Sequence, residues 1–171
     1  MDRKTFIKLS SITMTGALLN PDTVFSQGKE LTNWAGNFTF STNNLYYPHS
    51  VKEVQALVKK YPKVKALGTK HCFNRIADSK HNLISLKEMK GDISLDYIAH
   101  TVTVNGGVKY GELSPYLDSK GYALHNLASL PHISVAGAIA TATHGSGVKN
   151  GNLSSAVSGL EIVTASGDVI T

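Results

Sequence analysis

The sequence comprises 171 residues, of which 42% are hydrophobic and 17% are charged. This balance is typical of one soluble globular domain and excludes an intrinsically disordered chain. The net charge of +5 is a mild excess, and because no basic helix carries interleaved aromatic residues, we expect no nucleic-acid partner. A single cysteine, Cys72, excludes an intramolecular disulfide, and the Cys/His spacings of structural zinc sites are missing, so no metal site is expected.

Residues 1–26 are typical of an export signal. Arg3-Lys4 forms a charged start, residues 9–19 are moderately apolar, and residues 24–26 offer a cleavage site before Gln27. The apolar stretch is too short to cross a membrane, so we expect no stable membrane span. The charged start resembles a twin-arginine signal with one arginine replaced by lysine. The pattern predicts export to the periplasm; the alternative is an amphipathic helix of a cytoplasmic protein.

Strands and helices alternate after an anchoring segment at residues 27–37. Residues 45–48 predict a short extended segment, and His49-Ser50 can cap a helix over 51–61, which Pro62 ends. A strand at 64–67 completes a strand, helix, strand unit of the kind that builds a parallel sheet. We therefore expect a small α/β subdomain with parallel strands in this part of the chain.

The remaining elements predict a second subdomain with mixed or antiparallel strands, which makes the fold class α+β. The helix expected at Tyr110 to Lys120 stops at Gly121, a plausible C-terminal cap. A second helix is expected over Val135 to Thr141, with its N-terminus aimed at a phosphate. A Ser166-Gly167-Asp168 turn predicts a terminal hairpin. The expected strands are residues 83–86, 93–96, 101–104, 160–164 and a last one beginning at Val169.

Two glycine-containing stretches carry most of the chemical information. The first loop, residues 68–74, follows the strand at 64–67, so Gly68 can let backbone N–H groups converge on an anion. The second loop, residues 129–147, consists between Ser134 and Gly147 almost wholly of small residues, which allows backbone to approach something flat or extended, such as a dinucleotide. A single glycine loop after a strand is also found in ordinary turns, so neither stretch alone decides the function.

Together with residues 33–37 and 104–108, the two loops resemble the FAD-binding module of the vanillyl-alcohol oxidase superfamily, also called the PCMH-type FAD-binding domain. The likeness is greatest to the alditol and aldonolactone oxidases, and it covers residues 33–171. It implies that residues 38–171 form this domain, incomplete at its C-terminus, and that the separate substrate domain of such oxidases is absent from the chain.

The resemblance implies a set of cofactor-binding residues. His71 matches the histidine that is bonded to the flavin 8α-methyl in these enzymes, so FAD covalently attached through His71 is expected. The family has glycine and serine where this chain has Lys70 and Cys72. The implied FAD contacts are Ala66, Leu67, Gly68, Thr69, Lys70, His71, Cys72, Ser129, Ser134, Gly137, Ala138, Ile139, Ala140, His144 and Gly145.

Two residues are implied on the substrate side of the flavin. Ser129 matches a serine that faces the substrate, although a simple turn serine remains open. Ala128 matches a position whose bulk governs the approach of oxygen to the flavin. His125, His132 and His144 lack metal-ligand spacing and are expected to be structural.

The resemblance implies a flavoprotein that oxidises the CH–OH group of a sugar alcohol or aldonolactone. Oxygen, or another electron acceptor, is expected to reoxidise the flavin. Because the substrate domain is not in the sequence, this part alone is expected to be inactive. The alternative is a non-catalytic FAD-binding remnant or interaction module, since fold-level kinship does not choose between the two.

Overall fold

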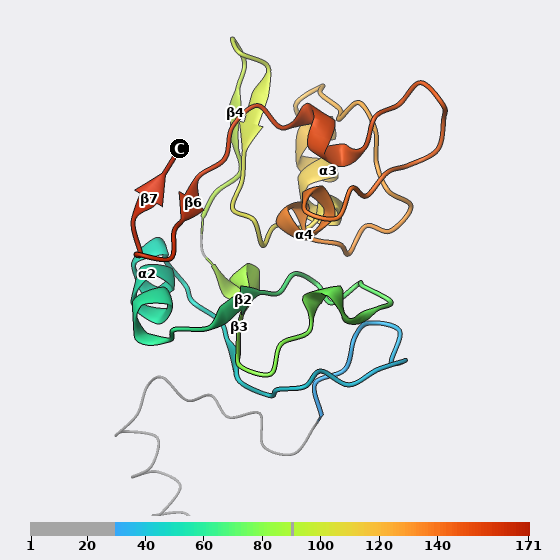
Figure 1. Cartoon of the computed structure of the whole chain (residues 1–171). Coiled ribbons are helices and arrows are strands. Elements are labelled where there is room, and N and C mark those ends of the chain that lie inside the picture. Colours follow the sequence, from blue (N-terminus) through green and yellow to red (C-terminus); the bar gives the residue numbers. More distant parts are fainter. Residues whose placement is uncertain (1–29, 90) are drawn as a thin grey trace, which may run out of the picture.

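The computed structural model describes residues 30–89 and 91–171. The predicted export signal lies outside these residues. The described chain forms two halves, one around a parallel sheet and one around helices α3 and α4 (Figure 1). No helix in the described ranges is long and apolar enough to cross a membrane. The α+β fold class predicted from the sequence is confirmed.

The first half is a three-stranded parallel sheet with the order β1-β3-β2. Its strands are β1 (Leu45–Tyr46), β2 (Val64–Ala66) and β3 (Asn82–Ile84), with Leu83 opposite both Leu45 and Lys65. The predicted parallel arrangement is confirmed, but β1 and β2 are not neighbours because β3 lies between them. Leu83 is fully buried in this central strand, where it packs with Phe40 and Leu67.

Helix α2 (Val51–Lys60) begins where the sequence predicts and ends one residue before the predicted Tyr61, which is its C-cap. Ser50 is its N-cap, and the Ser50 hydroxyl accepts from the Glu53 backbone N–H at 3.3 Å. The predicted strand at 83–86 is shorter in the structure, because Leu86 already begins the 3-10 helix η2 (Leu86–Glu88). A second 3-10 turn, η1 (Arg75–Ala77), follows the first loop.

The second half contains the hairpin β4 (Ser94–Asp96) and β5 (Thr101–Thr103), helices α3 (Tyr110–Ser119) and α4 (Val135–Ile139), and the 3-10 helix η3 (Leu153–Ala156). Gly121, with φ of 78°, ends α3 as predicted. Helix α4 stops at Ile139, short of the predicted Thr141, consistent with the low helix propensity of its glycine and its β-branched residues. The core of this half comprises Val108, Tyr110, Leu113, Leu117, Ile133, Ala138 and Leu153.

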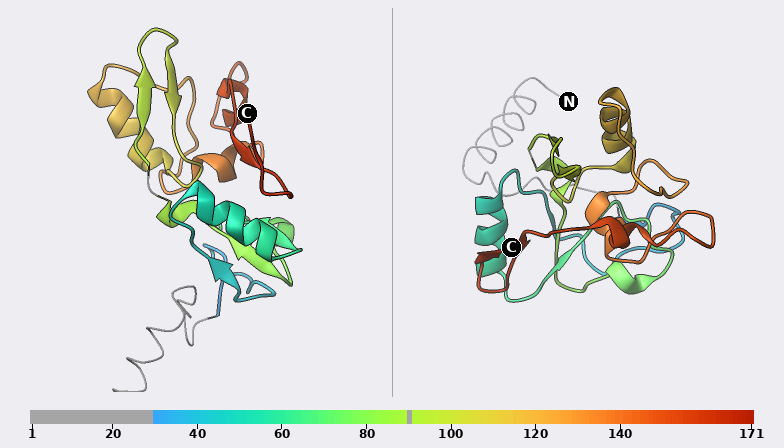
Figure 2. Two further views of the ribbon diagram at one scale, coloured as in Figure 1. Left: turned by 90° about the vertical axis from the view of Figure 1, so that its left-hand side faces the viewer. Right: turned by 90° about the horizontal axis from the view of Figure 1, so that it is seen from above.

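The chain ends in the predicted hairpin, formed by β6 (Ile162–Val163) and β7 (Val169–Ile170). This hairpin returns to the first half and lies against α2 (Figures 1 and 2). The Gln55 side-chain amide donates to the Gly167 carbonyl in the hairpin turn at 2.7 Å. The hairpin therefore ties the end of the chain to helix α2 of the first half.

Candidate functional site

The first loop leaves strand β2 and is held in shape by the anchoring segment. The backbone N–H of Trp34 donates to the Lys70 carbonyl at 2.8 Å. The side-chain amide of Asn33 donates to the Cys72 carbonyl at 3.0 Å, and that of Asn37 donates to the next carbonyl of the loop at 3.2 Å. Asn33 is 3% exposed, so its hydrogen bonds are shielded from competing water. These bonds fix the path of the loop.

Lys70 has an unusual backbone conformation within this loop. Its φ is 63°, in the left-handed region that favours glycine. The resembling enzymes carry glycine at this position, so this chain keeps the turn while adding a long cationic side chain. The bond from Trp34 to the Lys70 carbonyl supports this conformation.

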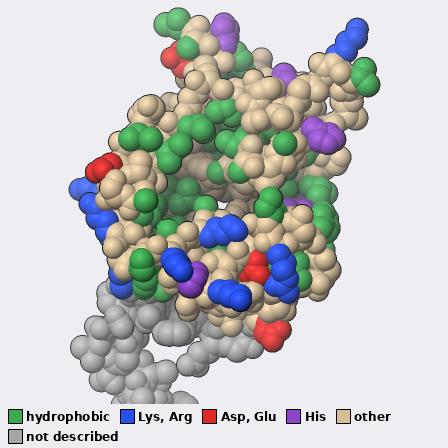
Figure 3. Space-filling model, in the orientation of Figure 1, with side chains coloured by type: hydrophobic (Ala, Val, Ile, Leu, Met, Phe, Trp, Pro, Cys, Tyr) green, Lys and Arg blue, Asp and Glu red, His purple; other side chains and the backbone are tan. Residues whose placement is uncertain are grey.

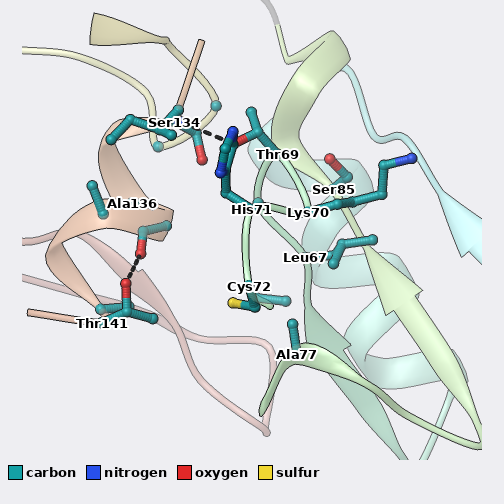
Figure 4. Close-up of a pocket in the computed structure, with 18 of the residues that line it drawn as sticks. Leu67, Thr69, Lys70, His71, Cys72, Ala77, Ser85, Ser134, Ala136 and Thr141 are labelled. Atoms are coloured by element: carbon teal, nitrogen blue, oxygen red, sulfur yellow. Dashed lines mark hydrogen bonds between the residues drawn. The ribbon is translucent and has the colours of Figure 1, made fainter. Parts of the chain in front are cut away.

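The second loop is held mainly by backbone hydrogen bonds. The N–H of Val135 donates to the Val108 carbonyl at 2.8 Å, and the N–H of Ala136 donates to the Gly106 carbonyl at 3.1 Å. Ser134 also donates its N–H to the Thr69 hydroxyl at 3.3 Å, which links the second loop to the first (Figure 4). The start of α4 is thereby placed beside the end of β2.

Ser134 occupies the closest contact between the loops. A Cβ atom added at Gly68 or at Gly137 would lie 2.9 Å from the Ser134 hydroxyl oxygen. Only glycine therefore fits at both positions without a shift of the serine. The hydroxyl is buried and has no hydrogen-bond partner among the described residues. A buried polar atom without a partner is costly, and it stands in the wall of a large cavity.

The cavity has a volume of about 1070 Å³ and lies between the two halves. This volume is at the upper end of the range for small-molecule and cofactor sites. The space-filling view shows the hollow, with hydrophobic side chains on its walls and basic side chains along its lower rim (Figure 3). Of the described residues that line it, none is acidic and four are lysines, namely Lys65, Lys70, Lys87 and Lys109. Lys87 and Lys109 pair with Glu88 and Glu112 at 3.4 and 3.3 Å. The positive charge that favours an anionic ligand is therefore mainly that of Lys65 and Lys70.

The rings of Trp34, His71 and His132 pack together beside the first loop. The ring of Trp34 stacks on His71 with centroids 4.4 Å apart and on His132 with centroids 5.2 Å apart. The Nε2 atoms of His71 and His132 are hydrogen-bonded to each other. Burial lowers the pKa of His71, and charge on His132 lowers it further. The neutral form of His71 therefore persists to a lower pH than that of an ordinary histidine.

Most of the sequence-predicted site residues come together around this cavity. Figure 4 shows Ser134, Ala136 and Thr141 across the cavity from Leu67, Cys72 and Ala77. Ile139, His144 and Gly145 are not among the residues that line it. The predicted residues that do line it are Ala66, Leu67, Gly68, Thr69, Lys70, His71, Cys72, Ala128, Ser129, Ser134, Gly137, Ala138 and Ala140.

Several residues that line the cavity were not predicted from the sequence. His132 was expected to be structural, but it contacts His71 and lines the cavity. Gly106 and Gly107 carried a signal, since they belong to one of the motifs that support the family resemblance. Ser85, Lys87 and Lys109 carried none, because nothing in their local sequence indicates which cavity they face.

The residues present fit an FAD molecule. A dinucleotide has an anionic pyrophosphate and a long flat body, and the cavity offers a cationic lining, small residues and a buried serine hydroxyl between two glycines. Gly68, Ser134 and the lysines would hold the anionic part. His71 would hold the flavin ring.

Comparisons with known proteins agree with this fit. The chain is 43% identical over 143 residues to an alditol oxidase from Streptomyces sp., covering 82% of this chain and 34% of that protein. It is 34% identical over 142 residues to a putative D-arabinono-1,4-lactone oxidase from Neurospora crassa, covering 81% of this chain and 26% of that protein. The chain thus spans about a third or less of the length of these relatives.

Among solved structures, the fold resembles cholesterol oxidase from B. sterolicum. The TM-score is 0.63 at 18% identity, and the match covers 74% of this chain and 25% of that one. This likeness shows the fold alone. Residues 43–171 match the model of the family described as the FAD binding domain, and the chain therefore belongs to the FAD-binding domain family.

Proposed function

We propose that this chain is the FAD-binding part of a flavoprotein oxidoreductase that oxidises the CH–OH group of a sugar alcohol or an aldonolactone. The observation that carries the proposal is the contact of Gly68, Ser134 and Gly137 in the wall of a lysine-lined cavity, in a chain of the FAD-binding domain family. Bound FAD supplies a ring that accepts a hydride from a C–H bond.

His71 is the residue through which we propose that FAD is attached covalently. Its loop matches that of the resembling enzymes, and the ring lines the cavity. Formation of the bond needs a ring nitrogen with a free electron pair, which only the neutral imidazole provides. The lowered pKa of His71, caused first by burial and then by His132, favours this neutral form.

The substrate side is assigned to the start of the second loop. Ser129 and Ala128 both line the cavity, and we assign to the Ser129 hydroxyl a hydrogen bond with a substrate oxygen. The small side chain of Ala128 leaves room for oxygen at the flavin, so we assign oxygen as the electron acceptor. The substrate classes are those named in the relatives, an alditol and an aldonolactone.

A denaturing gel of the full-length protein tests the attachment. We expect flavin fluorescence to stay with the unfolded protein, and we expect His71→Ala to lose it. Covalent flavin in His71→Ala would contradict the assignment of His71 as the attachment residue. Turnover is tested with a panel of alditols and aldonolactones while oxygen uptake is recorded. Bound flavin that no member of the panel reduces would instead support the non-catalytic FAD-binding module.

The route of the electrons is tested at Ala128. In the full-length enzyme, Ala128→Gly should quicken reoxidation of the reduced flavin by oxygen, because a methyl group is removed from the approach. Ala128→Val should slow it, while flavin reduction by substrate changes less. Equal stopped-flow reoxidation rates in all three proteins would show that oxygen does not pass this residue. Faster oxidation by an artificial dye than by oxygen would assign another acceptor.

We also propose that the protein is exported. The proposal rests on the charged start at Arg3-Lys4 and the cleavage site before Gln27. The mature protein should then begin at Gln27 when its N-terminus is sequenced. An intact Met1 on the protein from the cell envelope would contradict the proposal.

A further inference from the structure

Lys70 differs from the other three lysines that line the cavity. Two of those three pair with glutamates, as described above. The ammonium of the third, Lys65, donates to the carbonyl of Asp78 at 3.0 Å, and Asp78 does not line the cavity. The Lys70 ammonium has no hydrogen-bond or ion-pair partner among residues 30–89 and 91–171. Its charge is therefore available to a ligand.

Lys70 and Ser85 follow neighbouring strands of the parallel sheet. Ala66 of β2 lies opposite Ile84 of β3, and the Leu67 N–H donates to the Ile84 carbonyl at 2.8 Å. The first loop leaves β2 directly after this bond, and Ser85 is the residue after β3. Both residues thus lie at the carboxyl edge of the sheet, where parallel sheets bind their ligands. Figure 4 shows them on the same side of the cavity.

The Ser85 side chain is a second polar group without a partner at this edge. The residue is 6% exposed and lines the cavity, and its hydroxyl has no hydrogen-bond partner in the described part of the chain. Burying a hydroxyl in this state is unfavourable, and a ligand oxygen relieves it. An ammonium and a hydroxyl, on walls that carry no carboxylate, are donors suited to a phosphate oxygen.

The backbone of Lys70 makes its presence informative. Its φ of 63° lies in the left-handed region, where a lysine is strained and glycine is not. The resembling enzymes carry glycine at this position. Strain of this kind persists at functional sites, where the side chain contributes to the task rather than to stability. The unpartnered ammonium is the part of Lys70 that glycine lacks.

We propose that Lys70 is a specificity-determining residue for the cofactor: its ammonium pairs with the diphosphate of FAD, and the Ser85 hydroxyl donates to the same group. The proposal rests on the binding of FAD proposed above, and it singles out one of the cavity lysines. It predicts that FAD binding in this chain depends on charge, and that Lys70 lowers the stability of the fold while it raises the affinity for the cofactor.

The test is a fluorescence titration of FAD into the full-length apoprotein. Every protein carries His71→Ala, so that FAD exchanges and the affinity is an equilibrium value. We expect Lys70→Met, which keeps the length of the side chain without its charge, to bind FAD about tenfold more weakly at low salt. Lys70→Arg should retain most of the affinity. Ser85→Ala should bind about threefold more weakly.

Salt identifies the charge contact, because the diphosphate carries the negative charge of oxidised FAD. Raising NaCl from about 0.01 to about 1 M shortens the Debye length from about 30 to about 3 Å. The affinity of the parent protein should fall over this range, and that of Lys70→Met should change less. Lys80→Met removes an exposed lysine that does not line the cavity, so it is the matched control and should behave as the parent does.

Lys70→Gly gives a readout that a structural role does not produce. Urea denaturation of the apoprotein should show a higher free energy of unfolding, while the FAD titration shows weaker binding. Parent-like affinity and salt dependence in Lys70→Met would overturn the proposal, as would a larger loss in Lys65→Met than in Lys70→Met. Unchanged affinity in Ser85→Ala would overturn the part assigned to that hydroxyl. A parent protein that binds no FAD at any salt concentration would instead contradict the proposed function, which is a separate result.

Discussion

The first and second loops both line the cavity, but they are held in different ways. Side-chain amides of Asn33 and Asn37 fix the first loop by bonding to its carbonyls. Backbone bonds to residues 106–108 fix the second loop. Polar side chains therefore shape one wall, whereas the other depends on backbones that approach closely because their residues are small.

The structure gives the glycines around the cavity a different role from the one that the sequence suggests. The sequence suggested that the small residues of the second loop make room for a dinucleotide. In the structure, Gly137 of the second loop and Gly68 of the first leave room for Ser134, and Gly107, which lies between the two loops in sequence, leaves room for the backbone of Leu86. These glycines therefore allow close contacts within the protein, and those contacts form the wall of the cavity.

The largest expected effect comes from breaking a backbone contact. A Cβ atom at Gly107 would overlap the carbonyl group of Leu86, which is backbone and cannot rotate away. Gly107→Ala should lower the free energy of unfolding by about 3 kcal/mol, measured by urea denaturation. Gly159→Ala is the control, because nothing lies within 4 Å of the added atom. Equal stability of the two variants would show that the second wall does not depend on close backbone packing.

The next effect comes from the side-chain anchors of the first loop. Asn33→Ala removes a buried amide and leaves the Cys72 carbonyl without it. We expect a loss of about 2 kcal/mol in the free energy of unfolding. Asn150→Ala removes an exposed amide that bonds to the Ser146 carbonyl and should change stability by less than about 0.5 kcal/mol. Similar losses in both variants would argue against a special role for the anchoring segment.

A smaller effect is expected at Asp78, which follows η1 and joins the first loop to the sheet. The Ser41 backbone N–H and hydroxyl, each at 2.7 Å, lower the pKa of Asp78 to about 2, with help from Arg75. Because the folded-state pKa is below the unfolded value of 3.8, this stabilisation is complete above pH 3.8 and is lost as the pH falls through about 2.

Asp78→Asn should therefore lower stability at pH 7 by about 1 kcal/mol and remove this part of the acid dependence. The measurement is the urea midpoint as a function of pH. Asp118→Asn, which changes an exposed residue at the end of α3, is the control. A wild-type midpoint that stays flat from pH 5 to about pH 2 would contradict the role assigned to these hydrogen bonds.

The smallest effect has the opposite sign. Lys70 and His100 have φ values of 63° and 51°, so glycine at either position relieves backbone strain. Lys70→Gly and His100→Gly should each raise the free energy of unfolding by about 0.5 kcal/mol. Lys80→Gly, at a position that is not among the residues with positive φ, should not be stabilising. A lower free energy of unfolding in Lys70→Gly would mean that the Lys70 side chain stabilises the fold by more than its positive φ destabilises it.

Local patterns predicted most of the elements. Ser50 and Pro62 mark the ends of α2, and Gly121 marks the end of α3, because caps and breakers act within a few residues. The position of β3 between β1 and β2 could not be predicted, since strand order depends on contacts distant in sequence.

The same limit applies to the site. The motifs placed His71 and Ser134 in a cofactor site, and both line the cavity. The pairing of His71 with His132 has no local signal, because it arises only when the two loops meet. Ile139, His144 and Gly145 belong to the same motif as Ser134, but motif membership alone does not bring a side chain to the cavity.

Binding of FAD to the cavity is the central claim, and a fluorescence titration of FAD into the full-length protein freed of flavin tests it most directly. Ala140 is exposed and lines the cavity, so Ala140→Trp adds a bulky side chain at the cavity wall without replacing a core residue. Val148→Trp, at a fully exposed residue that does not line the cavity, is the control. We predict one FAD per chain for the wild type and for Val148→Trp, and binding about tenfold weaker or more for Ala140→Trp. Equal affinity in all three proteins, or no binding by the wild type, would contradict the account.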